Sequence, residues 1–308
     1  MREQIVIGTR GSLLALWQAR WVQSQLNKIH PNVKVELKTI KTKGDKILDV
    51  PLAKVGGKGL FVKEIETALL EKDIDLAVHS MKDMPAKMPD GLCLAAITQR
   101  ENPQDVLISR NEYQLLDLPQ KSTVGTSSLR RSSQLLHWRP DLSIVSLRGN
   151  LNTRLKKMKT ENLDAIILAA AGVIRLELEH LIAEFIDTDK MVPAVGQGAL
   201  GIEIRSDDTE LLSTIQQLND SETNAAVTAE RAFLHQLDGG CQVPIGAYAT
   251  IDDQLLSIQG MVADLTGQPL LKHRLTGKPE HALQLGQELA EHLLKQGAKK
   301  ILDKIYNR

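Results

Sequence analysis

The stretch DLAVHSMKDMP, residues 75–85, is the part of the chain that most clearly indicates its fold. Its first six residues have the length and apolar character of a strand buried inside a sheet. The polar residues that follow form a loop, which Pro85 stiffens at its exit. Loops at the carboxyl ends of such strands line the ligand cleft of α/β proteins. We therefore expect Asp83, the acid in this loop, to face a cleft.

The alternation of strand and helix extends in both directions from this stretch. Upstream, IVIGT reads as a strand and residues 12–29 as an amphipathic helix. Downstream, STVGTSSLRRSSQLL and LSIVSLRGNLNTRLKKM each read as strand, turn and helix. This order predicts α/β architecture with parallel sheets and helices on both faces. Breaks at residues 101–103 and at Pro193 suggest two similar lobes around a cleft.

The pattern changes from about residue 221 onward. A helix over residues 222–237 is followed by three strand-like runs, which Asp-Asp and Thr-Gly turns connect, and by a last helix over residues 279–295. This part of the chain predicts a small α+β domain with an antiparallel sheet.

Composition disfavours several kinds of partner. The 308 residues have a formal net charge of zero and only 3% aromatics, which argues against nucleic acid. The longest apolar run, AIILAAAGVI, is too short to span a bilayer. The first residues read as a strand and not as an export signal, and two distant cysteines suit a reducing cytosol. We expect a cytoplasmic protein without nucleic-acid or membrane partners, and nothing in the sequence demands more than a monomer.

Two nucleotide-binding patterns fail in their context. Residues 196–201 spell G-x-G-x-x-G, but the strand IEIR follows where a helix would have to begin, so a glycine-rich crossover between domains is the better interpretation. Gly57-Lys58 lacks both the following Ser or Thr and the first glycine of a phosphate-binding loop. No Cys/His pair has the spacing of metal ligands, so we expect no metal.

The two cysteines have different surroundings in the sequence. Cys241 directly follows a Gly-Gly pair in HQLDGGCQVPIGA, whereas Cys93 lies in the apolar strand GLCLAAI and reads as a buried, inert thiol. Nothing places His235 beside Cys241, which disfavours a thiol hydrolase. His79 reads either as a general base or as a strand-end histidine bonded to backbone.

Arginines recur where predicted strands end and helices begin. A guanidinium matches carboxylates and phosphates in a bidentate manner, and helix N-termini add backbone donors. Any single one could be a surface residue or part of an interdomain ion pair, but together they predict a site for several anions. Hydroxyls at one such turn, Thr126, Ser127 and Ser128, would support it. The arginines are Arg10, Arg130, Arg131, Arg148, Arg154 and Arg175, the last of which follows a predicted buried strand and turn.

Asp83 is the one acid predicted among these cations. A carboxylate there can accept a hydrogen bond from a ligand N–H and stabilise a cationic intermediate. The alternative is an aspartate that caps a helix or holds the loop together.

Five segments resemble motifs of one family. AVHSMKDMP, VGTSSLRRSSQL, LRGNLNTRL, VPAVGQGALGIE and LDGGCQVPIGA are similar to motifs of the porphobilinogen deaminases, also called hydroxymethylbilane synthases. The resemblance begins at IGTRGSLLALWQA and covers nearly the whole chain. It implies a transferase that joins four porphobilinogen molecules head to tail with loss of ammonia and releases the linear tetrapyrrole hydroxymethylbilane.

The resemblance also implies a domain organisation. Two lobes similar to periplasmic binding proteins would flank a cleft, and a small C-terminal α+β domain would present Cys241. Domain 1 would comprise residues 1–100 and 193–220, domain 2 residues 101–192, and domain 3 residues 221–308.

Roles for individual residues follow from the same resemblance. A dipyrromethane cofactor would be attached to Cys241 through a thioether, and Asp83 would be the catalytic aspartate. Further contacts to the cofactor would come from Ser80, Lys82, Thr126, Ser128, Arg130 and Arg131. Substrate carboxylates would be bound by Arg10, Arg148, Arg154 and Arg175. Lys54, Lys58 and Phe61 would belong to a flap over the site.

Two other classes of protein remain open from the residues alone. A solute-binding protein without enzymatic activity would share the two-lobed cleft and the anion-binding helix ends, but it gives no role to Cys241. A thiol-dependent transferase would use Cys241 as its nucleophile.

Overall fold

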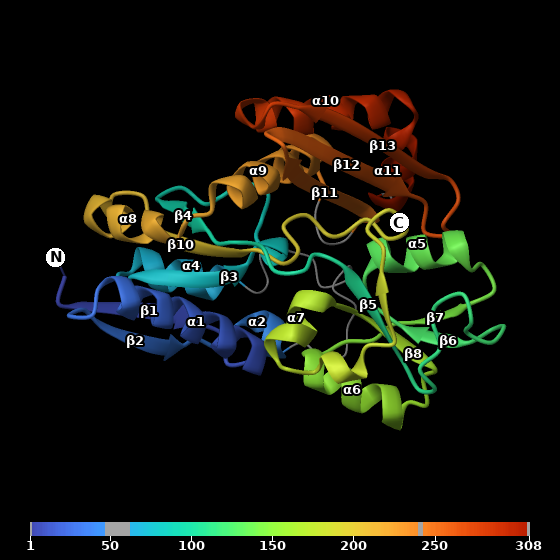
Figure 1. The fold of residues 1–308 in the computed structure, drawn as a ribbon, viewed down its shortest axis with the longest axis horizontal. Coiled ribbons are helices and arrows are strands. Elements are labelled where there is room, and N and C mark those ends of the chain that lie inside the picture. Colours follow the sequence, from blue (N-terminus) through green and yellow to red (C-terminus); the bar gives the residue numbers. More distant parts are fainter. Residues whose placement is uncertain (1, 47–61, 240–242, 307–308) are drawn as a thin grey trace.

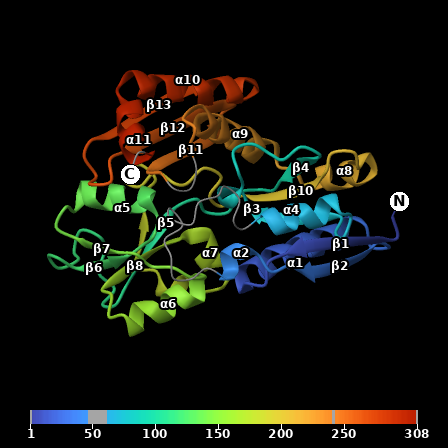
Figure 2. The ribbon, with the colours of Figure 1, turned by 180° about the vertical axis from the view of Figure 1, so that it is seen from behind.

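Three separate sheets organise the protein, whose computed structural model describes residues 2–46, 62–239 and 243–306. The first and second sheets belong to two lobes that lie side by side, and the third belongs to a C-terminal unit that lies across them (Figure 1). The view from behind shows the same arrangement (Figure 2). Each sheet is built within one of the three predicted domains; the exact domain boundaries stay a prediction.

The first lobe is a five-stranded sheet with helices on both faces. Its core on one face is shared with α1 (Leu13–Ile29) and α8 (Thr209–Ile215), and its core on the other face with α4 (Lys63–Leu70). Ser12 caps α1, since its side chain accepts a hydrogen bond from the backbone N–H of Ala15. In sheet order the strands are β2 (Lys34–Thr39), β1 (Gln4–Thr9), β3 (Leu76–Ser80), β10 (Leu200–Arg205) and β4 (Leu92–Ile97). The helices are α1 (Leu13–Ile29), α2 (Lys43–Lys46), α4 (Lys63–Leu70), η1 (Met81–Asp83), α8 (Thr209–Ile215) and η3 (Gln216–Leu218).

The second lobe repeats this design. Ser128 and Asn150 cap α5 and α6, each accepting a hydrogen bond from a backbone N–H three residues on. In sheet order the strands are β7 (Ser143–Val145), β6 (Thr123–Gly125), β8 (Ala165–Ala169), β5 (Asp105–Ser109) and β9 (Glu184–Ile186). The helices are α5 (Leu129–Trp138), α6 (Leu151–Thr160), α7 (Ala170–Arg175) and η2 (Glu179–Leu181).

The prediction of purely parallel sheets is wrong. β1, β2 and β3 are parallel, as are β6, β7 and β8, but β10 runs antiparallel to β3 and β4. Likewise β5 runs antiparallel to β8 and β9. Both exceptions are the first strands after the chain has crossed from one lobe to the other. They enter their sheets from the crossing and not through a helical connection, so no right-handed crossover fixes their direction.

The sequence prediction left out several helices, of which α7 and α11 matter most for the site and the C-terminal core. Residues 170–175 form α7 where a turn was expected, because two alanines follow β8 and Val173 packs into the core below. Arg175 therefore lies in the last turn of a helix and does not follow a strand directly. After the expected last helix, α11 (Ala298–Tyr306) adds Ile301 and Leu302 to the C-terminal core.

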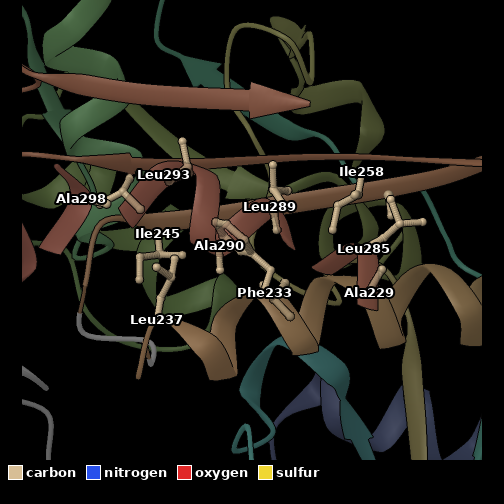
Figure 3. Close-up of a cluster of buried hydrophobic side chains, with 14 of the residues drawn as sticks. Ala229, Phe233, Leu237, Ile245, Ile258, Leu285, Leu289, Ala290, Leu293 and Ala298 are labelled. Carbon is tan, nitrogen blue, oxygen red and sulfur yellow. The ribbon is translucent and has the colours of Figure 1, made fainter. Parts of the chain in front are cut away.

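The C-terminal unit packs three helices on one face of an antiparallel sheet. Phe233, Leu289 and Ile258 lie together in this core (Figure 3). A Cβ on Gly260 would lie 2.6 Å from the ring of Phe233, so a glycine lets helix and sheet approach this closely. The strands are β11 (Ile245–Asp252), β12 (Leu255–Ala263) and β13 (Leu270–Gly277), and the helices are α9 (Ser221–Gln236), η4 (Pro279–His281), α10 (Ala282–Lys295) and α11.

Candidate functional site

A pocket of about 60 Å³ opens at the carboxyl ends of β1 and β3. Its lining includes Arg10, from the loop between β1 and α1, and Ser80 and Asp83, from the end of β3 and the following η1. Ser12, Gln18 and His79 are the other polar residues of its described lining. The strand-end loops thus bring together three of the residues that the sequence predicted for the site.

Two methionines anchor the turn that presents Asp83. Met81 and Met84 are buried, and the backbone N–H of Met81 donates to the carbonyl of Ala199 in the segment before β10. Ser80 is fixed as well, since its hydroxyl accepts a hydrogen bond of 2.8 Å from the amide of Gln18 on α1. Between these anchors Lys82 and Asp83 are half-buried. Burial of the apolar residues on either side therefore fixes where the two charged side chains begin.

Positive charges crowd around this turn. Burial lowers the pKa of Lys82 to about 8, an effect that Asp83 opposes and the charge of Arg131 reinforces. Burial also lowers the pKa of Arg154 to about 10, and the charges of Arg131 and Arg148 add to this effect. These mutual effects place Lys82, Arg131, Arg148 and Arg154 within one electrostatic cluster around Asp83, which is the arrangement that the sequence predicted.

Arg130 and Arg131 form ion pairs with a residue that the sequence analysis missed. Asp105, at the start of β5, accepts hydrogen bonds from Arg130 Nη1 at 2.7 Å and from Arg131 Nε and Nη2 at 3.0 and 2.7 Å. Arg130 also donates to the carbonyl of Val192, and Arg131 to that of Ile167. The sequence did contain a signal for this residue, because Asp105 is an acid at the start of the mostly apolar strand DVLIS. The two arginines hold the pKa of Asp105 far below its usual range despite its burial.

The hydroxyls at this turn have local partners. Ser128 Oγ accepts a hydrogen bond from the backbone N–H of Arg131, and Thr126 Oγ1 accepts one from the backbone N–H of Ser128. Ser127 donates to the carbonyl of Leu147. The first two shape the N-terminus of α5 and thereby place Arg130 and Arg131 in its first turn.

Arg175 lies at a junction between the lobes. Its Nη2 donates to the carbonyl of Gly198 at 2.7 Å, and its guanidinium lies 5.6 Å from the centre of the Trp17 ring on α1. Burial lowers its pKa to about 10, an effect that the charge of Glu101 opposes. Arg175 thus connects the second lobe to both the first lobe and the segment that returns to it.

Two other residues differ from their predicted environments. His79 does not bond to backbone; its Nε2 lies 2.9 Å from Oε2 of Glu203, and both side chains are buried. Cys93 is half-buried and not fully buried, and burial together with the charge of Glu203 raises the pKa of its thiol. Neither group is placed to act as an activated nucleophile.

The arrangement suits an anionic ligand with N–H donors. Among the described residues that line the pocket, Arg10 supplies a positive charge and Asp83 a carboxylate that can accept hydrogen bonds, and further cations lie around the turn that carries Asp83. In the described part of the chain no three His, Cys, Asp or Glu side chains gather as a metal site would require. Over the same residues, no helix combines the length and the apolar character needed to cross a bilayer.

Comparisons with known proteins identify the family. A family profile described as "Porphobilinogen deaminase, dipyromethane cofactor binding domain" matches residues 5–213, and a second, "Porphobilinogen deaminase, C-terminal domain", matches residues 224–295. The chain belongs to the porphobilinogen deaminase family. The porphobilinogen deaminase of Syntrophotalea carbinolica is 57% identical over 96% of this chain and 94% of its own length. That of Desulforamulus reducens is 50% identical over 99% of both chains.

Solved structures of binding proteins match this porphobilinogen deaminase family member with low scores. The methionine-binding protein MetQ is 15% identical, covers 70% of this chain and 89% of its own, and gives a TM-score of 0.46. The periplasmic aliphatic sulphonate binding protein SsuA from Escherichia coli is 16% identical over 77% of this chain and 71% of its own, with a TM-score of 0.42. Values this low support no argument about function.

Four residues to which resemblance to the porphobilinogen deaminases assigns roles lie outside the described part of the chain. They are Cys241, the predicted attachment point of the cofactor, and Lys54, Lys58 and Phe61 of the predicted flap. Their roles stay predictions. In the sequence, Gly239, in the turn after α9, is the last described residue before Cys241. Val62, which lines the pocket, directly follows Phe61.

Proposed function

We propose that the chain has the activity of its family, joining four porphobilinogen molecules head to tail with release of ammonia to give hydroxymethylbilane. The observation that carries this proposal is the position of Asp83 in the pocket, within a cluster of Lys82, Arg131, Arg148 and Arg154. Porphobilinogen is a pyrrole that carries an acetate and a propionate. Its carboxylates suit the cations, and its ring N–H suits Asp83, the acid that lines the pocket.

We further propose that a dipyrromethane cofactor, joined to Cys241 by a thioether, occupies part of this cluster. Two pyrroles bring several carboxylates, and burial together with neighbouring positive charges lowers the pKa values of Lys82 and Arg154, so both side chains offer buried positive charge to such carboxylates. The residues present therefore fit the group. When bound, the cofactor supplies the pyrrole carbon to which the first substrate is joined.

The side chains of the chain divide the work between charge stabilisation and binding. Asp83 accepts hydrogen bonds from pyrrole N–H groups and stabilises the positive charge that develops on a substrate as ammonia leaves. Ser80, Lys82, Thr126, Ser128, Arg130 and Arg131 support the cofactor, directly or through the geometry of α5. The carboxylates of incoming substrate are bound by Arg10, Arg148, Arg154 and Arg175.

The remaining parts of the proposal concern the surroundings of the site. Lys54, Lys58 and Phe61 belong to a flap that covers the pocket during turnover. No metal takes part, and the protein acts as a cytoplasmic monomer. These statements rest on the family resemblance and on the composition of the chain.

The substitution Asp83→Asn tests the proposed function. It keeps the size of the side chain and removes the charge that stabilises the developing cation, so we expect turnover to fall roughly 100- to 1000-fold. Release of ammonia and formation of hydroxymethylbilane from porphobilinogen measure turnover, and the intact mass reports whether the cofactor is retained. We expect the cofactor to stay in place.

Asp90→Asn is the matched control, because Asp90 is exposed and lies in the loop seven residues further on. It should leave turnover unchanged. Full turnover by Asp83→Asn would reduce Asp83 to a structural role. A wild-type chain that binds porphobilinogen without consuming it would instead be a solute-binding protein, and the proposed function would be wrong.

A further inference from the structure

Three buried ionisable side chains beneath α4 have no part in the chemistry proposed above. His79 on β3 is 5% exposed, Glu203 on β10 is fully buried, and Glu66 on α4 is 9% exposed. Glu203 lies opposite Ala77 in the ladder between the two strands, so Glu203 and His79 are on the sheet face that α4 covers. The three side chains thus come from three elements of the first lobe; His79 and Glu203 are in contact, and the charges of both act on Glu66.

Two oxygens in this group make no hydrogen bond. Oε1 of Glu66 and Oε1 of Glu203 are both buried without a donor in the described part of the chain. An ionised carboxylate that loses water without gaining a donor costs free energy, and two of them side by side also repel each other. Burial and the charge of Glu203 together raise the pKa of the Glu66 carboxyl, while His79 and Lys63 oppose this effect.

We infer that Glu66 and Glu203 share one proton, which Glu66 carries and donates from its O–H to Oε1 of Glu203. A single proton then gives both orphan oxygens a partner and removes one of the two buried charges. The remaining charge on Glu203 accepts a hydrogen bond from His79 through Oε2, at 2.9 Å. Because a carboxylate only accepts, the Nε2 atom of His79 must carry a hydrogen.

This buried pair connects to the functional pocket through His79. His79 lies in the pocket wall with Asp83, and it directly precedes Ser80. Because Nε2 is engaged by Glu203, the second ring nitrogen, Nδ1, is the atom left for a ligand or a water in the pocket. Glu203 fixes the ring by holding Nε2, and Glu66 fixes Glu203. Both glutamates are thus positioning residues that act through His79.

The other ionisable neighbours do not supply the missing donors. On α4, the charge of Lys63 opposes the rise in the pKa of Glu66 but makes no hydrogen bond to it. On β4, the thiol of Cys93 has its pKa raised by burial and by the charge of Glu203. On β10, the guanidinium of Arg205 is engaged by the carbonyls of Leu69 and Ile74 and by Asp208.

Infrared difference spectroscopy on the wild-type protein tests the shared proton without using activity. A carboxylic acid has a C=O stretching band distinct from that of a carboxylate, and we expect such a band at neutral pH. It should disappear in Glu66→Gln. If the wild-type protein shows no such band, or if the band persists in Glu66→Gln, the inference is wrong whatever the proposed function proves to be.

Activity measurements show whether the two glutamates position His79 or only stabilise the fold. This second experiment rests on the proposed function. Glutamine mimics a protonated glutamic acid and can donate to Glu203, so Glu66→Gln should keep kcat, KM and the pH profile of the wild type. Glu203→Gln removes the charge that orients His79, so we expect kcat to fall roughly 10- to 100-fold with an altered pH profile. An equal fall of kcat in both variants would contradict the shared proton. A Glu203→Gln variant with the kcat and pH profile of the wild type would contradict the inference as well. Circular dichroism confirms that each variant is folded.

Discussion

At the scale of single residues, the trio of Asp105, Arg130 and Arg131 has the clearest energetic consequence. All three residues are at most 5% exposed, and one carboxylate faces two guanidinium groups. A single negative charge cannot neutralise two positive ones, so the trio retains a net positive charge close to Lys82 and Asp83. Asp105 therefore holds the arginines in place and still leaves a charge for an anionic ligand.

Replacing Asp105 by Asn should destabilise the protein. It leaves two buried cations without a counter-ion, and breaking a buried ion pair in this way costs about 3–5 kcal/mol. Urea unfolding at neutral pH measures the loss. Asp141→Asn is the matched control, because Asp141 forms a comparable pair with Arg139 at the surface, and it should cost far less.

The pH dependence of this loss has a definite sign. The pKa of Asp105 is lower in the folded protein than in the unfolded chain, where it is about 3.9. The stabilisation is therefore complete above the unfolded value and is lost as the pH falls towards the folded one. The difference between wild type and Asp105→Asn should shrink below about pH 4. A difference that does not depend on pH would contradict this account of Asp105.

The sequence predicted the cations of the site better than their partners. Arg10, Arg148 and Arg154 were predicted from strand ends and helix starts, and Lys82 only from the family resemblance; Arg10 lines the pocket, and the charges of the other three act on one another or on Arg131 around Asp83. The partner of Arg130 and Arg131 could not be predicted, because Asp105 is 25 and 26 residues away and reaches them only when β5 enters the sheet beside β8. The bond between His79 and Glu203 spans 124 residues and was hidden for the same reason.

At the scale of elements, α9 connects the C-terminal unit to the turn that carries Asp83. Arg231 on α9 donates from Nη2 to the carbonyls of Pro85 and Ala86, at 2.8 and 3.0 Å. Burial lowers the pKa of this guanidinium. Cys241 follows the end of α9 within a few residues of sequence. The same helix therefore contacts the segment after Asp83 and precedes the predicted attachment point of the cofactor.

Substituting Arg231 by Leu should therefore impair catalysis more than folding. Loss of charge-assisted hydrogen bonds worth about 1.5–3 kcal/mol would displace Asp83 and lower kcat roughly 10- to 100-fold. The assay is turnover of porphobilinogen, with cofactor content followed by mass. Arg110→Leu is the control, since Arg110 also donates to two carbonyls, those of Met158 and Lys159, but in the second lobe and exposed. Equal kcat in the two variants would exclude a role for Arg231 in placing Asp83.

Strand direction was the main error at this scale. Alternation of strands and helices correctly predicted an α/β sheet in each lobe, but it does not report the direction of a strand that follows an interlobe crossing. β5 and β10 both lie in this position and both run antiparallel to their neighbours. The apolar pattern predicted β10 as a strand but left β5 unassigned, and it gave the direction of neither.

At the scale of the whole molecule, one segment is held by all three units. Residues 193–199 connect the second lobe to β10, and Arg175 of the second lobe donates to the carbonyl of Gly198. Met81 of the first lobe donates to the carbonyl of Ala199. Glu230 on α9 accepts from the backbone N–H of Gly196. The sequence predicted this segment as a glycine-rich crossover, and the structure shows one.

The glycines explain why this crossover is so tightly packed. Gly196 and Gly198 have φ angles of +71° and +94°, and a Cβ on Gly198 would lie 2.2 Å from the carbonyl oxygen of Glu101. Only glycine fits such a position without strain. The pattern that resembled a dinucleotide-binding motif thus serves to bring the crossing segments of the two lobes together.

The central claim is that the pocket serves a cofactor anchored on Cys241, and intact-mass spectrometry of the purified protein tests it most directly. We expect a mass above that of the 308-residue sequence by two linked pyrrole units. The same measurement on Cys241→Ser should give the sequence mass alone, and Cys93→Ser should keep the addition. An active wild-type protein with the unmodified mass, or an addition that survives in Cys241→Ser, would contradict the account.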